Sequence, residues 1–83
     1  MIILHAAPIT WGRIGGLHVS IPALVEAQDR LEGIDAALLI TASNGQKPPG
    51  LTSPVFQRTV RVDRGRLNLP SPFDRPDLVV FHS

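Results

Sequence analysis

Apolar residues gather in short runs along the chain, separated by glycine, proline and charged residues. Residues 2–7 and 35–42 form two runs that are apolar at nearly every position, and a third run, "DLVVFHS", occupies residues 77–83. Short runs with apolar side chains at both odd and even positions are typical of parallel strands whose two faces are both covered. The pattern therefore predicts two buried strands and a third apolar strand.

A helix is predicted between the first two strands. Ser20 is a suitable N-cap because its hydroxyl can accept from a free amide of the first helical turn, and Pro22 is tolerated in that turn. Gly33 suits the left-handed position that closes a helix. Four apolar residues lie near one face, interrupted by a polar one; the apolar residues are Ile21, Leu24, Val25 and Leu31, and the polar one is Gln28.

On the outer face of this helix, Glu26 and Arg30 are expected to form a small stabilising pair, since they stand four residues apart. The segment 43–54 is rich in glycine, proline, asparagine and serine and is predicted to be a loop. Residues 55–62 alternate apolar and polar side chains, which indicates a half-exposed edge strand. Residues 63–76 contain too many helix breakers for a long helix.

This order of elements predicts a single α/β domain. We expect a partial Rossmann-like, doubly wound sheet of three to four mainly parallel strands with one main helix. A strand as apolar as the last one is expected to need cover on both faces, and no helix follows it. The expectation is therefore a fold that is incomplete at its C-terminal end.

Composition narrows the possible partners. The chain has 83 residues and a net charge of +1, which argues against nucleic acid as a partner. There is no cysteine, so disulfides and thiolate chemistry are excluded. No apolar run reaches the roughly 18 residues that span a bilayer, and the first residues lack the features of a signal peptide. A cytoplasmic protein without a membrane span is expected.

The segment "WGRIGGLHVS", which follows the first strand, is the first candidate for binding chemistry. It is neither the dinucleotide fingerprint nor a P-loop, and the second strand ends at Thr41 without a ribose-binding carboxylate. A helix N-terminus after such a loop favours an anion. The glycines Gly12, Gly15 and Gly16 could equally serve only to make the turn.

The three histidines, His5, His18 and His82, have no metal-ligand spacing, and no metal site is expected. His5 within the first strand is expected to be a hydrogen-bonded core residue, and His18 could simply face solvent. His82 falls at the carboxyl end of a strand, where open α/β sheets bind their ligands. Asp77 is expected to begin the last strand, and nothing marks it or Asp74 as a catalytic acid or base.

Two motifs together resemble the N-terminal domain of family-four retaining glycosyltransferases of the GT-B fold. The first motif reads Gly-Gly, a short polar stretch, and then Ser-Ile-Pro-Ala-Leu; the matching residues are Gly15, Gly16, Ser20, Ile21, Pro22, Ala23 and Leu24. The second reads Pro-Asp, two apolar residues, two variable residues and then histidine; the matching residues are Pro76, Asp77, Leu78, Val79 and His82. The resemblance extends over the whole chain, which corresponds to less than half of such an N-terminal domain.

The resemblance implies a role for each of these residues. His82 would be the catalytic residue beside the transferred sugar. Gly15, Gly16, His18 and Ser20 would contact the substrate, a sugar nucleotide that serves as donor without any further cofactor. The acceptor would be a saccharide or a lipid, as in polysaccharide biosynthesis. Residues 1–83 would then be an N-terminal fragment that is inactive alone, because the second domain of the cleft is absent.

Two other readings stay open. The chain could be a small noncatalytic α/β module that binds a partner through an uncovered sheet, or a nucleotide-binding domain without transfer activity. Exposed apolar surface on the last strand also predicts self-association, because Val79 and Phe81 lie on one face and Leu78 and Val80 on the other.

Overall fold

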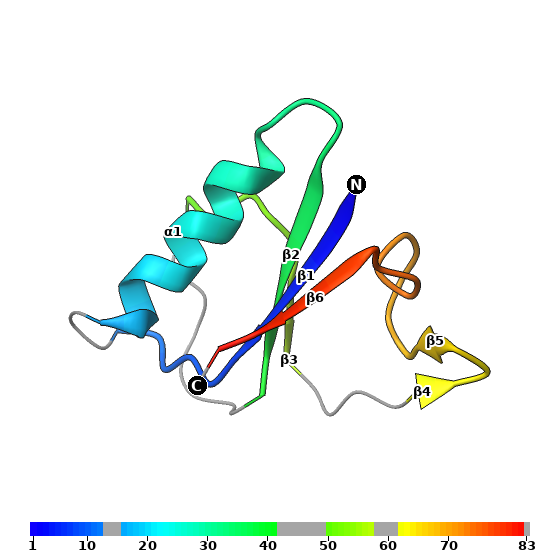
Figure 1. The fold of residues 1–83 in the computed structure, drawn as a ribbon. Helices are drawn as coiled ribbons and strands as arrows, with labels where there is room; N and C mark the ends of the chain where they lie inside the picture. The colour runs from blue at the N-terminus through cyan, green and yellow to red at the C-terminus, as the bar shows by residue number, and fades with distance from the viewer. Residues whose placement is uncertain (13–15, 42–49, 58–61, 83) are drawn as a thin grey trace.

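A computed structural model describes residues 1–12, 16–41, 50–57 and 62–82. One helix and six strands form within these ranges (Figure 1). They are β1 (Ile2–Ala7), α1 (Leu17–Asp29), β2 (Asp35–Ile40), β3 (Val55–Gln57), β4 (Val62–Asp63), β5 (Arg66–Leu67) and β6 (Leu78–Phe81). The three strands predicted from the apolar runs are β1, β2 and β6.

Four strands pair into one parallel sheet in the order β3-β2-β1-β6. Ile2 lies opposite Asp35 in the register of β1 and β2, and Ile3 lies opposite Leu78 in that of β1 and β6. The fold is thus the predicted Rossmann-like α/β arrangement with one main helix. The central position of β1 explains why its residues 3–7 are all buried.

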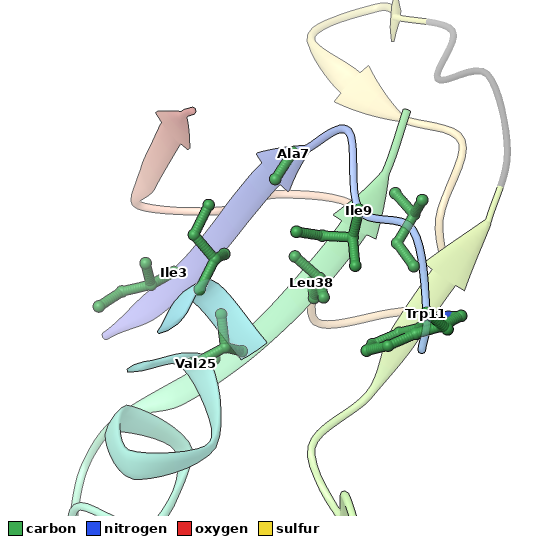
Figure 2. Packing of buried hydrophobic residues seen from close by; sticks show 9 residues of the cluster. Ile3, Ala7, Ile9, Trp11, Val25 and Leu38 are labelled. Carbon is green, nitrogen blue, oxygen red and sulfur yellow. The ribbon is translucent and has the colours of Figure 1, made fainter. Parts of the chain in front are cut away.

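One face of the sheet packs against α1 (Figure 1). Val25 of the helix is fully buried against Ile3 and Leu38 of the sheet, and Ile9 and Trp11 extend the same cluster beyond the end of β1 (Figure 2). Burying one such aliphatic side chain contributes roughly 1.5–3 kcal/mol. The odd-numbered positions of β1 therefore fix how α1 docks.

The opposite face is covered by the segment between β3 and β6, which contains no helix in its described residues 62–77. Leu69 and Phe73 of this segment pack on Leu4 and Leu39. Both faces of the central strands are thus covered, although only one is covered by a helix. The expectation that breakers prevent a long helix here is confirmed.

Strands β4 and β5 pair as a tight antiparallel hairpin within this segment. Its two turn residues, Arg64 and Gly65, have φ values of 53° and 76°. Two left-handed residues in succession make the turn type whose twist matches a hairpin. The alternation of apolar and polar residues predicted one continuous edge strand over residues 55–62 instead. β3 does occupy the sheet edge, but Val62 belongs to the separate hairpin, and residues 58–61 lie outside the described residues.

The predicted start of the helix was wrong. α1 begins at Leu17 with Gly16 as its N-cap, and Ser20 lies inside the helix, where its hydroxyl donates to Gly16 O at 3.1 Å. Pro22 is therefore an interior residue of the helix and not part of its first turn. Gly33 does take the left-handed conformation that was predicted, with φ of 79°.

Two side-chain assignments on α1 were also wrong. Leu24 and Leu31 are exposed, so the buried stripe of the helix is narrower than predicted. Glu26 does contact Arg30, at 3.4 Å, yet its side chain is buried instead of lying on an outer face. Within the described residues, no helix is both long and apolar enough to cross a membrane.

Candidate functional site

The carboxyl edge of the sheet is the place where the candidate residues meet. All four strands are parallel, so their carboxyl ends lie at one edge, and the N-terminal end of α1 lies there too (Figure 1). β1 has β2 on one side and β6 on the other, so the strand order reverses at β1. Open α/β sheets bind ligands in the crevice at such a reversal.

His82 follows β6 directly and is held against the end of β1. Its backbone amide donates to Ala6 O at 2.9 Å. Its ring stacks on that of His5, with centroids 5.2 Å apart and planes inclined by 19°. A hydrogen bond of 2.9 Å joins His82 Nε2 to His5 Nδ1. The side chain that was predicted to face a ligand crevice is thus half-buried and paired with a second imidazole.

His5 is the hydrogen-bonded core histidine that was predicted, and it has a second partner on α1. Its side chain is 2% exposed, and its Nε2 lies 2.6 Å from Gln28 Oε1. Both ring nitrogens of His5 are therefore engaged, as a buried polar group requires. The three side chains form a chain of hydrogen bonds from the helix, through the central strand, to the end of β6.

The electrostatic state of His82 follows from these surroundings. Burial, and secondarily the neighbouring His5, lowers the pKa of His82 below its ordinary value of 6.5. The ring is consequently neutral at pH 7, with one nitrogen protonated and the other carrying a lone pair. A neutral imidazole can accept a hydrogen bond from a ligand hydroxyl.

Two glycines of the segment between β1 and α1, Gly12 and Gly16, fall within the described residues. Gly12 and Gly16 have φ values of 84° and 60°, which favour glycine. A Cβ on either residue would meet nothing within 4 Å, so their backbone conformation, and not lack of space, accounts for them. Gly15 lies outside the described residues. The turn alone is thus a sufficient explanation for Gly12 and Gly16.

The N-terminus of α1 has no side-chain cap and no acidic residue in its first turn. Val19 and Ser20 direct their amides to Gly16 O, while the preceding amides have no helical carbonyl to bond. His18 points back to the loop after β1, where its Nδ1 accepts from the amide of Thr10 at 2.9 Å. His18 therefore holds the loop in place, and its Nε2 carries the ring proton of the neutral form.

Carboxylates gather at the opposite, amino edge of the sheet. Asp77 Oδ2 accepts from the amide of Ile2 at 2.7 Å, and Asp29 Oδ1 accepts from that of Ala36 at 3.0 Å. β6 begins at Leu78, so Asp77 immediately precedes this strand instead of beginning it as predicted. Asp77 and Asp29 are thus engaged with the amides of β1 and β2.

Glu26 is the third carboxylate of this kind. It accepts from the amides of Thr52 and Ser53, just before β3, and from the Thr52 hydroxyl. These hydrogen bonds, with the Thr52 side chain contributing most, lower the pKa of Glu26 to about 2. Near the start of each of β1, β2 and β3, a side-chain carboxylate therefore accepts a hydrogen bond from a backbone amide. We call each of these contacts a carboxylate clamp.

Gln28 belongs to the candidate site although the sequence pattern did not predict it. It was noted only as a polar interruption of an apolar helix face, and the pairing of His5 with His82 was not predicted either. The signal was the coincidence of two polar residues, Gln28 and His5, at positions that otherwise face the core. Buried polar groups need partners, and these two are partners of each other.

Within the described residues, no three histidine, cysteine, aspartate or glutamate side chains gather as metal ligands would. The candidate site is therefore built from the His5–His82 pair, Gln28 and the N-terminus of α1. Comparison of the chain with protein-family models, with curated proteins and with solved structures finds no match.

Proposed function

We propose that this chain forms part of the active-site cleft of a sugar-nucleotide-dependent glycosyltransferase. In that reaction the bond between the sugar and the nucleoside diphosphate breaks, and a bond forms between the sugar and an acceptor hydroxyl oxygen, which gives up its proton. The 83 residues would supply one wall of the cleft and would be inactive alone.

The observation that carries the proposal is the position of His82. It lies at the carboxyl end of β6, next to the central strand β1, where the strand order reverses. Its lowered pKa keeps the ring neutral at pH 7, so it can hydrogen-bond a sugar hydroxyl without placing a fixed positive charge in the cleft.

The N-terminal end of α1 supports the same proposal. A helix of 13 residues with an uncapped N-terminus and no acidic residue in its first turn favours a negatively charged group. The donor's diphosphate is such a group, and Gly15, Gly16, His18 and Ser20 would lie on that side of the substrate. His82 would then lie on the side of the sugar.

The test is sugar transfer by the protein translated from the complete reading frame that contains these residues. Wild-type protein is incubated with a panel of sugar nucleotides and saccharide or lipid acceptors, and product is detected by mass spectrometry. His82→Ala should lower turnover about a hundred- to thousandfold, the loss expected for one preorganised contact in a transition state. Glu32→Gln, on an exposed residue, is the matched control and should keep full turnover.

Folding of each variant is checked by circular dichroism before activity is compared. If folded His82→Ala keeps wild-type turnover, His82 is only the end of a strand. If no donor in the panel supports transfer by the wild-type protein, the proposed function is wrong.

A noncatalytic interaction module is the second candidate, and the surface of β6 favours it. Leu78 is 47% and Phe81 is 80% exposed, on opposite faces of this strand. Covering such surface favours self-association. Sedimentation of the 83-residue chain at high concentration should show dimers or larger species. A sharp monomer that binds no apolar dye would contradict this second candidate.

A further inference from the structure

We propose that Gln28 and His5 are positioning residues that hold His82 in its Nε2–H tautomer and so present its Nδ1 lone pair to the ligand. The inference rests on the proposed function for the identity of that ligand, a sugar hydroxyl. The tautomer itself follows from the hydrogen bonds of the free protein.

The first step is the contact between α1 and β1. Gln28 Oε1 lies 2.6 Å from His5 Nε2. A carbonyl oxygen of an amide side chain only accepts hydrogen bonds, so His5 Nε2 must carry the proton. The helix thus selects the tautomer of a histidine that lies in the core of the sheet.

The second step passes from β1 to β6. A neutral His5 that is protonated at Nε2 has a lone pair at Nδ1. His82 Nε2 lies 2.9 Å from that Nδ1, and therefore His82 Nε2 donates. The 2% exposure of His5 keeps water from supplying an alternative partner to either nitrogen.

The third step concerns the nitrogen that remains. In the neutral ring that the lowered pKa favours, His82 Nδ1 is unprotonated, and no described residue donates a hydrogen bond to it. The two hydrogen bonds, between Gln28 and His5 and between His5 and His82, therefore form a relay. This relay makes His82 Nδ1, which could otherwise donate or accept, an acceptor only. Such a group binds a hydroxyl better than it binds a diphosphate oxygen, because a phosphate oxygen offers no proton.

The test reads the tautomers directly, in the folded 83-residue protein without any substrate. Long-range ¹H–¹⁵N spectra at pH 7.5 distinguish the protonated from the lone-pair nitrogen of each ring. We expect both His5 and His82 to carry their proton on Nε2. A His82 protonated on Nδ1 would overturn the inference, because it would mean that His5 donates and that the Gln28 amide faces the other way.

A variant tests whether Gln28 is responsible. In Gln28→Leu the acceptor is gone, and we expect the Nδ1 and Nε2 shifts of His82 to move toward each other as both tautomers become populated. Ala27→Leu introduces the same leucine side chain at the neighbouring, exposed position and should leave the His82 shifts unchanged. A folded Gln28→Leu with wild-type His82 shifts would overturn the role of Gln28.

These measurements are independent of the proposed function. A wrong tautomer overturns the positioning role and leaves sugar transfer to its own assay. Absence of sugar transfer, with the tautomers as expected, overturns the glycosyltransferase proposal and leaves a hydrogen-bonded relay that presents an acceptor to some other hydroxyl.

Discussion

The two edges of the sheet use polar side chains in opposite ways. At the amino edge, Asp77, Asp29 and Glu26 accept hydrogen bonds from backbone amides within two residues of the starts of β1, β2 and β3. At the carboxyl edge, His82 Nε2 is hydrogen-bonded to His5, and no described residue donates a hydrogen bond to His82 Nδ1. The carboxylates of the amino edge thus bind strand backbone, whereas His82 at the carboxyl edge retains the ring nitrogen that our proposal assigns to a ligand.

The contrast shows that a charged or polar residue beside a strand end is not by itself evidence of a site. What separates the two edges is whether a side chain binds the backbone of a strand, as the carboxylates do, or instead binds another side chain and keeps a ring nitrogen to which no described residue donates, as His82 does. If this distinction is correct, changes at the amino edge should reduce the free energy of unfolding, and changes at the carboxyl edge should leave it nearly unchanged.

The largest effect on stability is expected at Glu26. Glu26→Gln replaces one carboxylate oxygen by an NH₂ group, which would face the amides of Thr52 and Ser53 with a donor instead of an acceptor. We expect the midpoint of urea denaturation to fall further for this variant than for any other described below. Circular dichroism in a urea series measures it.

Glu32→Gln is the matched control, because it removes the same charge from an exposed position. Its midpoint should equal that of the wild-type protein. Equal midpoints for Glu26→Gln and Glu32→Gln would mean that the clamp before β3 contributes nothing.

Lowering the pH should weaken the same clamp, because the Glu26 carboxylate becomes protonated. The pKa of Glu26 is lowered from 4.5 to about 2, so the stability that this carboxylate contributes is complete above pH 4.5 and is lost as the pH falls toward 2. Glu26→Gln should lack this part of the acid transition. The measurement is the unfolding midpoint of both proteins between pH 7 and pH 2, and parallel curves over the lower window would contradict the prediction.

His82 should add a separate, shallower loss of stability at higher pH. Because its pKa in the folded protein lies below 6.5, the unfolded chain takes up a proton first, and stability decreases as the pH falls below 6.5. His82→Ala should remove this slope while leaving the Glu26 window unchanged. The same pH series checks it, and an unaltered slope in His82→Ala would count against a neutral His82.

A smaller effect than that of Glu26→Gln is expected at Asp77. Asp77→Ala removes the acceptor for the amide of Ile2 in an exposed setting. The loss should be about 1 kcal/mol, the net contribution of an ordinary hydrogen bond. Asp35→Ala, also exposed and also at a strand start, serves as control. Chemical denaturation that finds the two variants equally stable would remove Asp77 from the set of clamps.

The smallest effect on stability is expected for His82→Ala itself. The substitution opens a path by which water can reach His5 Nδ1 and replace the lost partner, so the free energy of unfolding should change by no more than about 0.5 kcal/mol. A loss as large as that of Glu26→Gln would show that both edges serve the fold, and the distinction between them would fail.

The strands were predictable because each is a short run with apolar side chains on both faces. These side chains are buried over residues 3–7 of β1 and 36–40 of β2, whereas Leu78 and Phe81 of β6 are exposed.

The start of α1 was not predictable, since Ser20 has the residue type of an N-cap while the helix is set by Gly16 and by the contact of His18 with Thr10. Local capping rules describe one turn of chain. They do not describe a contact between the helix and the preceding loop, such as the hydrogen bond from the Thr10 amide to His18.

The hydrogen-bond partners of Glu26 and His5 could not be predicted from the sequence, because they lie far away along the chain. Glu26 has Arg30 four residues away, yet its strongest partners are 26 and 27 residues away. His5 and His82 are 77 positions apart. Sequence predicted that His5 is hydrogen-bonded in the core and that His82 ends a strand, but the pairing depends on the register of β1 and β6.

The most direct test of the central claim is to map where a sugar nucleotide binds. Backbone amide shifts of the 83-residue protein are recorded during titration with nucleoside diphosphate sugars. We expect perturbations at Gly16, His18 and His82, and none at Ile2, Ala36 or Ser53. Perturbations confined to the amino edge, or to the groove that Arg66 and Arg75 line on the other face of the sheet, would contradict it.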